Sequence, residues 1–362
     1  MKILAVVPSL YDTSPGQRFR LEQWEPILKQ SGVEITWAPF ETEGLRQVLY
    51  KPGLAMGKIR AVVSNMKRRS AELERAGEYD VVYVFREAAL LGPPWFERKI
   101  ARKNVPMVFD FDDAVFVAYR SPSNGYLSYL KFPQKTGEIC RLSAHVMAGN
   151  QYLADYASQF NENVTIVPTT IDTLKYQEMA KDKGSDVITI GWSGSYSTVQ
   201  HLDTIREVLQ ELAKDEKFRL RVIGTPDYNL SGVDTEALQW KAATEIDDLA
   251  QIDIGLMPLP DDQWSKGKCG LKALQYMALG VPTVCSPVGV NSTIIQDGEN
   301  GFIADTKAEW IAKLKLLLHS PDLRRRVGTA GRKTVEKKYS AETQAPRVLE
   351  IFESVVRKAK AP

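Results

Sequence analysis

The chain has 362 residues, 44% of them hydrophobic and 25% charged, and a formal net charge of +2. This length favours two domains over one, and the near balance of charge gives no reason to expect nucleic-acid binding. Three scattered cysteines and three isolated histidines exclude a disulfide framework and do not resemble a zinc site. We expect a cytoplasmic protein, because the first apolar run, Ile3–Val7, is too short for an export signal and no run is long enough to span a bilayer.

Short, continuous apolar runs alternate with helix-length segments along the whole chain. Continuous runs are typical of parallel strands that are buried on both faces. Strands that alternate with helices predict an α/β fold with doubly wound sheets. The expected strands are Ile3–Val7, Val33–Trp37, Val81–Phe85, Val105–Phe109, His145–Ala148 and Val164–Val167 in the first half, and Val187–Trp192, Phe218–Ile223, Asp253–Met257 and Pro282–Cys285 in the second.

This pattern occurs twice, which predicts two Rossmann-like domains that face each other across a cleft. We expect an N-terminal domain over residues 1–172, a polar linker over 173–186, a C-terminal domain over 187–340 and a final helical segment over 341–362. Doubly wound domains bind ligands at the carboxyl ends of their strands, so the loops that follow strands are the candidate site segments.

The loop that contains Gly194 and Ser195 follows an expected strand and opens a helix that includes Leu202 and Leu209. Glycine allows a tight turn, and free amides at a helix N-terminus suit a phosphate. The alternative is a simple strand-to-helix turn with a Ser or Thr cap. The G-x-G-x-x-G dinucleotide spacing is absent.

A second loop, Lys266-Gly267-Lys268-Cys269-Gly270-Leu271-Lys272, precedes an expected helix at Ala273–Leu279. Backbone amides together with lysines would neutralise a diphosphate, including one that gains charge as it leaves. The alternative is a solvated lysine-rich turn. The apolar face of the following helix favours the functional interpretation.

Candidate residues in the first half also follow expected strands. Ser14–Arg20 brings a glycine and two arginines to the end of the first strand, either against a ligand or as a plain turn. Asp110–Asp113 contains a D-x-D pattern, which holds a divalent metal in other folds; here we favour a position that lines the cleft. Arg86 ends the third strand and would either line the cleft or form an internal ion pair.

These motifs resemble those of retaining glycosyltransferases of family 4. The order and spacing of the C-terminal motifs are similar to the donor-binding half of that family, and Val167–Asp172 resembles its interdomain segment. The motifs concerned are Asp253–Pro258, Lys268–Pro282, Ser286–Val290 and Asp297–Phe302, with weaker matches at Ser14–Arg20, Asp110–Asp113 and Gly149-Asn150.

The resemblance implies a GT-B fold with the acceptor on the N-terminal domain, the donor on the C-terminal domain, and a terminal helix that returns to the N-terminal domain. It implies transfer of a sugar, with retention, from a nucleoside-diphosphate sugar to a glycan or lipid-linked acceptor in cell-surface polysaccharide or glycoconjugate synthesis. No metal or other cofactor is expected, because the leaving phosphate itself accepts the acceptor's proton. The protein then has to position the reactants and stabilise charge.

The resemblance also implies roles for particular residues, with two departures from the family. The two positions of its E-x7-E motif are held by Gly267 and Gln275, and Asp112 stands where a histidine is usual. A glutamine still hydrogen-bonds a ribose hydroxyl, but without charge assistance. The expected catalytic residues are Lys268, Lys272 and Asp112; the expected donor-binding residues are Gly16, Gln17, Arg18, Gly194, Ser195, Gly267, Cys269, Gly270, Leu271 and Gln275; Arg86 and Asp113 are expected on the acceptor side.

Two other functions stay open. A nucleotide-sugar epimerase of the same architecture would need histidines and carboxylates as acid and base near the sugar, and the motif regions offer no histidine. The missing glutamates instead favour a non-catalytic protein that binds nucleotide sugars. Turnover of a donor and the identity of the product separate these alternatives.

The segment Lys51–Arg69 interleaves six basic residues with apolar ones. A basic amphipathic helix of this kind lies on anionic membrane surfaces. It therefore predicts peripheral contact with the inner face of the plasma membrane. The alternative is an ordinary surface helix packed on the N-terminal domain.

Overall fold

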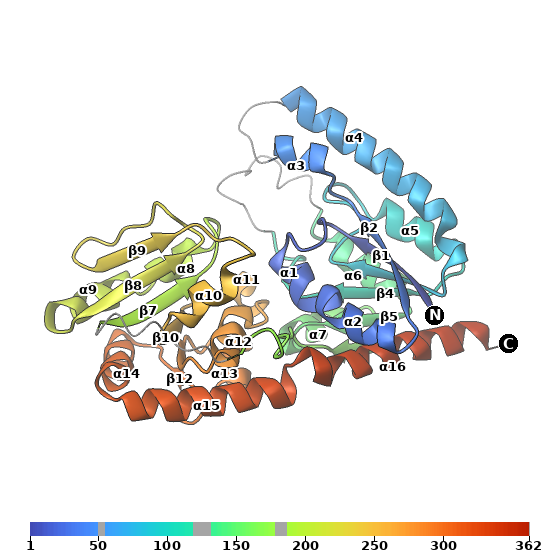
Figure 1. Ribbon diagram of the computed structural model, residues 1–362. Coiled ribbons are helices and arrows are strands. Elements are labelled where there is room, and N and C mark those ends of the chain that lie inside the picture. The colour runs from blue at the N-terminus through green and yellow to red at the C-terminus, as the bar shows by residue number, and fades with distance from the viewer. Residues whose placement is uncertain (50–54, 119–131, 178–186, 362) are drawn as a thin grey trace. The chain divides into compact units, whose positions relative to one another are not determined.

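The computed structural model describes residues 1–49, 55–118, 132–177 and 187–361. The chain divides into two compact units, which are treated separately below. Unit 1 comprises Met1–Thr169 and Gln344–Pro362, and unit 2 comprises Thr170–Thr343. Figure 1 labels the helices and strands.

Unit 1 is built on a six-stranded parallel sheet with the order β2-β1-β3-β4-β5-β6. The strands β1, β3 and β4 are apolar and almost wholly buried, as expected for a parallel sheet with both faces covered. The strand bounds are β1 Lys2–Val7, β2 Glu34–Pro39, β3 Val81–Phe85, β4 Met107–Phe111, β5 His145–Ala148 and β6 Val164–Ile166.

Helices follow the strands of unit 1 along the chain. They are α1 Pro15–Gln17, the π-helical turn η1 Arg18–Glu22, α2 Gln23–Gln30, α3 Glu43–Leu49, α4 Ala55–Glu72, the 3₁₀ turn η2 Leu73–Glu78, α5 Trp95–Ala101, α6 Lys135–Leu142 and α7 Gln151–Ala157. Most of α16 (Ala341–Lys360) also belongs to unit 1. There Phe352 packs edge-on against Tyr83 of β3, with 6.1 Å between ring centroids.

Unit 2 holds a second six-stranded parallel sheet, with the order β12-β11-β10-β7-β8-β9. Counted within the unit, this is the 3-2-1-4-5-6 order of dinucleotide-binding domains. The bounds are β7 Ile188–Ser193, β8 Phe218–Ile223, β9 Asp234–Leu238, β10 Ile254–Met257, β11 Thr283–Cys285 and β12 Phe302–Ile303. The helices are α8 Val199–Asp203, α9 Arg206–Asp215, α10 Glu245–Ala250, α11 Gln263–Lys266, α12 Leu271–Ala278, α13 Asn291–Ile294, α14 Lys307–His319 and α15 Pro321–Lys338.

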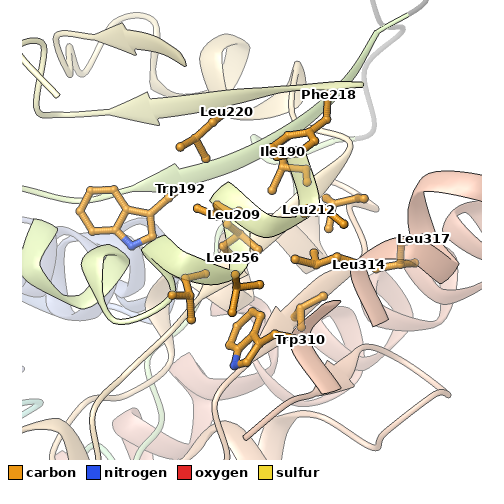
Figure 2. Packing of buried hydrophobic residues seen from close by; sticks show 14 of the residues in the cluster. Ile190, Trp192, Leu209, Leu212, Phe218, Leu220, Leu256, Trp310, Leu314 and Leu317 are labelled. Carbon is orange, nitrogen blue, oxygen red and sulfur yellow. The ribbon is translucent and has the colours of Figure 1, made fainter. Parts of the chain in front are cut away.

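The core of unit 2 lies between the sheet and helices α9 and α14, as Figure 2 shows. Leu209 and Leu212 of α9 and Leu314 of α14 are buried together with side chains from β7, β8 and β10. Trp192, near the end of β7, is fully buried in this cluster. The ring therefore anchors the strand end from which the Gly194 loop begins.

Each sheet has one point where the strand order reverses, and ligands bind at such points in doubly wound folds. In unit 2 the reversal lies between β7 and β10, so the loops after these two strands leave side by side. In unit 1 it lies between β1 and β3. Most of the expected site loops follow β1, β3, β7 and β10, at the two reversal points, while Asp112 and Asp113 follow the neighbouring strand β4.

The expected strands are found, but several boundaries differ. Strand β4 runs two residues later than the expected Val105–Phe109, so Asp110 lies within the strand rather than after it. Two short strands, β9 and β12, were not expected; β9 is polar, exposed at its first residue and otherwise half-buried, and it lies at the sheet edge. The helix expected to run through Leu202 and Leu209 is two helices, α8 and α9.

The segment expected to link the two domains is partly packed into unit 2. The boundary between the units falls at Thr169–Thr170, and Tyr176 is buried in unit 2. The remainder, residues 178–186, lies outside the described residues. Among the described helices, not one has the length and apolar character to cross a bilayer.

Candidate functional site

The N-terminus of α12 lies open to a ligand. Gly270 precedes the helix with φ 75° and ψ 12°, and no side chain caps the helix. A Cβ at this position would lie 2.3 Å from Cδ1 of Ile294, so both the backbone conformation and the packing require glycine. The first-turn amides of this eight-residue helix therefore carry the positive end of its dipole without a side-chain partner.

Lys272, in the first turn of α12, lies over an aromatic ring. Its Nζ is 4.8 Å from the centroid of Trp192, a cation–π contact. Among the described residues, no carboxylate is within salt-bridge distance of Lys272. Burial and the neighbouring Lys268 lower the pKa of Lys272 to about 7. The amine therefore sits where a positive charge is poorly compensated by the protein.

Lys268 supplies a second cation in the same loop. Its Nζ lies 4.9 Å from the ring centroid of Trp264, on α11. That short helix is capped by Asp262, whose carboxylate accepts a hydrogen bond from the Ser265 amide at 2.7 Å. The fold thus holds the loop of the two lysines firmly before α12 begins.

His201 lies close to both lysines, which the sequence did not predict. It is buried on α8, and burial, Lys272 and Lys268 lower its pKa to about 4. The imidazole is therefore neutral at pH 7, and its Nδ1 has no hydrogen-bond partner among the described residues. One feature of the sequence could have marked His201 as a site residue. It lies on the helix that follows the Gly194 loop, and that loop lies at the strand-order reversal.

These groups form one positively charged site at the reversal point of unit 2. Two lysines and the open end of α12 converge on it, and the lysines lie over indole rings. Such a site favours a compact dianion, because helix amides and cations act in the same direction. It would hold a diphosphate and stabilise the charge that the diphosphate gains on leaving.

Other residues expected to bind the donor are used within unit 2. The amide of Gly194 donates to the Ile223 carbonyl at 2.9 Å, and the amide of Ser195 donates to Thr198 Oγ1 at 3.0 Å. These two amides are thus not free for a phosphate. Thr198 closes the turn through Ser195, but its side chain does not cap helix α8.

Gln275 is buried in an internal hydrogen-bond network. Its Nε2 donates to the Tyr176 hydroxyl at 3.0 Å and to Glu245 Oε1 at 3.4 Å. Tyr176 and Trp240 also donate to Glu245, each at 3.0 Å. The Gln275 amide nitrogen therefore fixes the segment before residue 178, and the expected ribose contact of this amide has no support in the geometry.

The remaining loop residues shape the backbone. Gly267 ends α11 through a hydrogen bond from its amide to the Trp264 carbonyl at 3.1 Å. Cys269 is buried, and its thiol donates to the Gly267 carbonyl at 3.6 Å. Leu271 begins α12 and is half-buried. Their side chains bring no charged group to the site.

The reversal point of unit 1 brings Gly16, Arg86 and Asp112 together. A Cβ on Gly16 would lie 2.5 Å from Arg86 Nη2 and 2.9 Å from Asp112 Oδ2. Arg86 Nε donates to Asp112 Oδ1 at 2.7 Å. Arg86 has φ 57°, a conformation that costs energy in a residue other than glycine and clusters at functional sites.

Asp110 is excluded from this site. It is fully buried and forms a two-point ion pair with Arg20, with distances of 2.6 and 2.5 Å. The Tyr83 hydroxyl also donates to this carboxylate, and burial raises the pKa of Tyr83 well above its ordinary value. The D-x-D interpretation is therefore wrong for Asp110, because its oxygens are committed inside the unit.

Three further residues of unit 1 form local contacts. Gln17 is buried, and its Nε2 donates to the Ser9 carbonyl at 3.1 Å and to Glu22 Oε1 at 2.7 Å. Arg18 pairs with Asp12 at 2.8 Å. Asp113 accepts from the Ala114 amide at 3.1 Å. The buried amide of Gln17 holds the β1–α1 loop in place, and the expectation that it binds the donor is not supported.

The described residues contain no group of three or more His, Cys, Asp and Glu side chains that would hold a metal ion.

The family comparison covers the part of the chain, less than half of it, that carries the charged site. Residues 177–334 match the family described as "Glycosyl transferases group 1". A stretch of 76 residues is 34% identical to EpsD of Bacillus subtilis and covers 20% of this chain. The match spans only 20% of the length of that relative.

Solved structures resemble nearly the whole chain. Sucrose-phosphate synthase from Thermosynechococcus elongatus has a TM-score of 0.74 at 13% identity, with 99% of this chain and 100% of that chain covered. A glycosyltransferase from Rickettsia africae has a TM-score of 0.69 at 14% identity, with 98% of each chain covered. Anabaena HepE in complex with UDP and glucose has a TM-score of 0.66 at 13% identity, with 98% of this chain and 100% of that chain covered.

The chain has the GT-B fold. Identities this low establish the fold alone, and the family match over residues 177–334 adds the class of domain. Together they show a GT-B fold whose residues 177–334 match a glycosyltransferase domain family.

Proposed function

We propose that this protein is a retaining glycosyltransferase, similar to those of family 4, that moves a sugar from a nucleoside-diphosphate sugar to a glycan or lipid-linked acceptor. The observation that carries the proposal is the open N-terminus of α12 with Lys272 and Lys268 beside it. A diphosphate matches this site in charge and size, and it is the leaving group of every such donor.

The proposed chemistry uses no protein nucleophile. The bond between the anomeric carbon and the diphosphate oxygen breaks, and the acceptor oxygen bonds to the same face of that carbon. The acceptor's proton passes to the departing phosphate oxygen. Lys268, Lys272 and the α12 amides stabilise the charge that develops on the diphosphate, so the reaction as proposed requires no metal.

The pair Arg86–Asp112 beside Gly16 is the proposed sugar-facing and acceptor-facing part of unit 1. Its carboxylate and guanidinium lie at a strand-order reversal, where ligands bind in this class of sheet. A paired arginine and aspartate offers both acceptors and donors to sugar hydroxyls. Asp113 follows Asp112 in the chain, two residues after β4 ends.

Helix α4 is the proposed membrane contact of a cytoplasmic enzyme. Its side chains Met56, Ile59 and Val63 are exposed and recur at helical spacing, next to Lys58 and Arg60. This combination suits an anionic lipid surface. Co-sedimentation with phosphatidylglycerol vesicles but not with phosphatidylcholine vesicles is the expected result; equal recovery with both would remove this part of the proposal.

Fewer basic side chains of the predicted segment are available to lipid than the sequence suggested. Arg69 is fully buried, and its guanidinium donates to the Ala38, Ala88 and Val7 carbonyls. Arg68 pairs with Glu72 at 2.6 Å. The first residues of the predicted segment, 51–54, lie outside the described residues. Arg68 and Arg69 are thus not available to lipid, while Lys58, Arg60 and Lys67 remain as basic residues of the described helix.

A second candidate is a protein that binds nucleotide sugars without turning them over. Gly267 provides no side chain at the first position of the E-x7-E motif, and the amide nitrogen of Gln275 at the second is committed to Tyr176 and Glu245. Binding of a diphosphate without release of sugar to water or to any acceptor would favour this candidate.

The deciding experiment is a calorimetric titration of the purified chain with UDP, GDP, ADP, CMP and dTDP, first with EDTA and then with magnesium. We expect one diphosphate to bind without metal, and UDP comes first because the HepE neighbour was solved with it. That diphosphate names the donors for a transfer assay in which the anomeric configuration of the product is determined. Absence of binding to all five would overturn the proposed function, and binding only with magnesium would contradict its metal-free form.

A further inference from the structure

Tyr196 is an exposed aromatic residue in the loop that follows β7. Its relative exposure is 58%, and it lies in the turn before α8 begins. A single exposed aromatic residue on a protein surface needs no explanation. This loop, however, begins at the strand-order reversal of unit 2, where ligands bind in doubly wound sheets. The position of the ring, more than its exposure, therefore makes it a candidate for contact with a ligand.

The ring is held in place by the connection between β8 and β9. The hydroxyl of Tyr196 donates to Oδ2 of Asp227, in that connection, at 2.8 Å. The same connection bonds back to α8, because the hydroxyl of Tyr228 donates to Oδ1 of Asp203 at 3.1 Å. A ring anchored at its hydroxyl loses little conformational freedom when a planar ligand settles on it.

The two connections also meet through their backbones. A Cβ on Gly224, which has φ 103°, would lie 1.8 Å from the carbonyl oxygen of Gly194, so this close approach requires glycine. Thr225 follows and is buried, and its Oγ1 has no hydrogen-bond partner among the described residues. Buried polar atoms without a partner are uncommon in proteins. A polar ligand at this edge of the sheet would supply one.

The ring of Tyr196 lies toward the side of β7 that faces away from the lysine loop. The ring of Trp192, at the end of β7, lies under Nζ of Lys272, 4.8 Å from it, whereas Tyr196 comes four residues later and bonds to the β8–β9 connection. In the sheet, β7 lies between β8 and β10, the strand that leads to α12. Neighbouring strands lie about 4.8 Å apart, so the ends of β10 and β8 are separated by roughly 10 Å. A ligand whose diphosphate lies at the N-terminus of α12 thus has room to extend across the end of β7 to Tyr196.

We propose that Tyr196 stacks on the nucleobase of the donor while the lysine loop holds the diphosphate. The inference rests on the proposed function and adds to it the side chain that binds the nucleoside half of the donor. A nucleobase fits the position because it is planar and every base has a π-face that stacks on an aromatic ring. Binding of this kind forms and breaks no covalent bond.

Inorganic pyrophosphate separates the two halves of the site, because it carries the diphosphate without the base. The full chain is titrated by calorimetry with UDP, or with the nucleoside diphosphate that binds in the titration above, and pyrophosphate is then measured as its competitor. Tyr196→Ala should weaken the nucleoside diphosphate roughly 5- to 100-fold, the range for loss of one stacked base. Pyrophosphate should compete with the wild-type chain and keep its affinity within about twofold in the variant, since it does not reach the ring.

Two further variants test whether the ring itself is responsible. Tyr196→Phe keeps the ring and loses only the bond to Asp227, so its affinity for the nucleoside diphosphate should stay within about threefold of the wild-type value. Leu316→Ala is the matched control, because Leu316 is an exposed apolar residue of α14 in the same unit, with a relative exposure of 53%. It should bind both ligands like the wild-type protein. Thermal unfolding of each variant should be unchanged, as expected for exposed positions.

Three outcomes would overturn the inference and leave the proposed function standing. They are full affinity of Tyr196→Ala for the nucleoside diphosphate, equal losses for the nucleoside diphosphate and pyrophosphate, and failure of pyrophosphate to compete. A loss in Tyr196→Ala that appears with the sugar-bearing donor but not with the nucleoside diphosphate would place the ring against the sugar and would also overturn it. Failure of every nucleoside diphosphate to bind the wild-type chain would overturn both.

Discussion

The reversal points of the two sheets carry charge in opposite ways. In unit 1 the arginines are paired: Arg20 with Asp110 and Arg86 with Asp112. In unit 2 the lysines Lys268 and Lys272 lie over indole rings. A guanidinium that already holds a carboxylate positions other groups, whereas Lys272, for which no ion pair is found among the described residues, retains its attraction for an incoming anion. We therefore expect an anionic ligand to bind to unit 2.

The cost of these two arrangements also differs. A buried ion pair balances desolvation with mutual attraction, so Arg20 and Asp110 are stable only together. Lys272 has no such compensation among the described residues, and unit 2 therefore carries a destabilised group at its candidate site. Loss of stability at a functional position is common where binding needs an unsatisfied charge.

The largest effect should come from breaking the buried pair of unit 1. Asp110→Ala leaves the Arg20 guanidinium buried without a carboxylate, and removal of one partner of such a pair costs about 3–5 kcal/mol. Amide hydrogen exchange of the full chain should show faster exchange in the peptides of β1, β3 and β4, while the peptides of β7, β8 and β10 are unchanged.

Glu78→Ala provides the control for this prediction, because Glu78 forms an exposed ion pair with Arg75 in the same unit. Exposed pairs contribute little, so exchange should be unaltered. Protection of β3 and β4 that survives Asp110→Ala would mean that Arg20 finds another partner, and the contrast between the two units would lose its basis.

Lys272→Met should lower the affinity for a diphosphate and raise the stability of unit 2. Loss of the cation should weaken diphosphate binding about 10- to 100-fold, the range for a hydrogen bond to a charged group. Removal of this half-buried amine, whose pKa is lowered by desolvation, should at the same time stabilise unit 2. The measurements are calorimetry with UDP and thermal unfolding of the free protein.

The pH dependence of that stabilisation follows from the lowered pKa. Lys272 has a pKa of about 7 in the folded state and about 10.4 when unfolded. Between these values the unfolded chain binds more protons, so wild-type stability rises with pH from 7 to about 10.4. The gain from Lys272→Met should therefore be largest at pH 6 and should shrink at pH 9. A gain in stability that does not depend on pH would show that the folded protein does not disfavour the charged form of Lys272.

The sequence predicted the features that depend on short stretches of chain. Apolar runs gave the principal strands, and the loop from Lys266 to Lys272 was assigned to a diphosphate because glycine, lysines and a helix start lie within seven residues. Their role toward a diphosphate stays a prediction, and the helix begins at Leu271 rather than Ala273.

The features that the sequence did not predict depend on residues far apart in the chain. Arg20 and Asp110 are separated by 90 positions, and Gln275 and Tyr176 by 99. No local pattern signals that such partners will take up a carboxylate or an amide. The proximity of His201 to Lys268 and Lys272 is of the same kind, because these lysines follow more than sixty residues later. For similar motifs in other proteins, the structure must be known before single side chains are assigned to a ligand.

A smaller effect is expected from His201. Its pKa is about 4 in the folded protein and about 6.5 when unfolded. Stability is therefore fully present above pH 6.5 and is lost as the pH falls toward 4, by about 1–2 kcal/mol at pH 5. His201→Gln should remove this acid sensitivity from unit 2. Hydrogen exchange of β7 and α9 peptides at pH 5 and pH 7 measures it, and the same slope in wild type and variant would contradict it.

The smallest effect should follow from Gly16→Ala. The added Cβ would lie 2.5 Å from Arg86 Nη2 and 2.9 Å from Asp112 Oδ2, so the ion pair has to shift. Because the obstacle is the end of a flexible side chain, we expect a stability cost of about 1 kcal/mol or less.

The functional readout of Gly16→Ala separates the two units. If unit 2 alone binds the diphosphate, UDP affinity should stay within about twofold, since sites without shared partners act independently. Transfer of sugar should fall several-fold, because misplacement near the reacting atoms lowers the rate. Gly44→Ala is the matched control, as a Cβ on Gly44 meets nothing within 4 Å. A loss of UDP affinity in Gly16→Ala alone would place part of the diphosphate site in unit 1, and the assignment of anion binding to the lysines of unit 2 would have to include the β1–α1 loop.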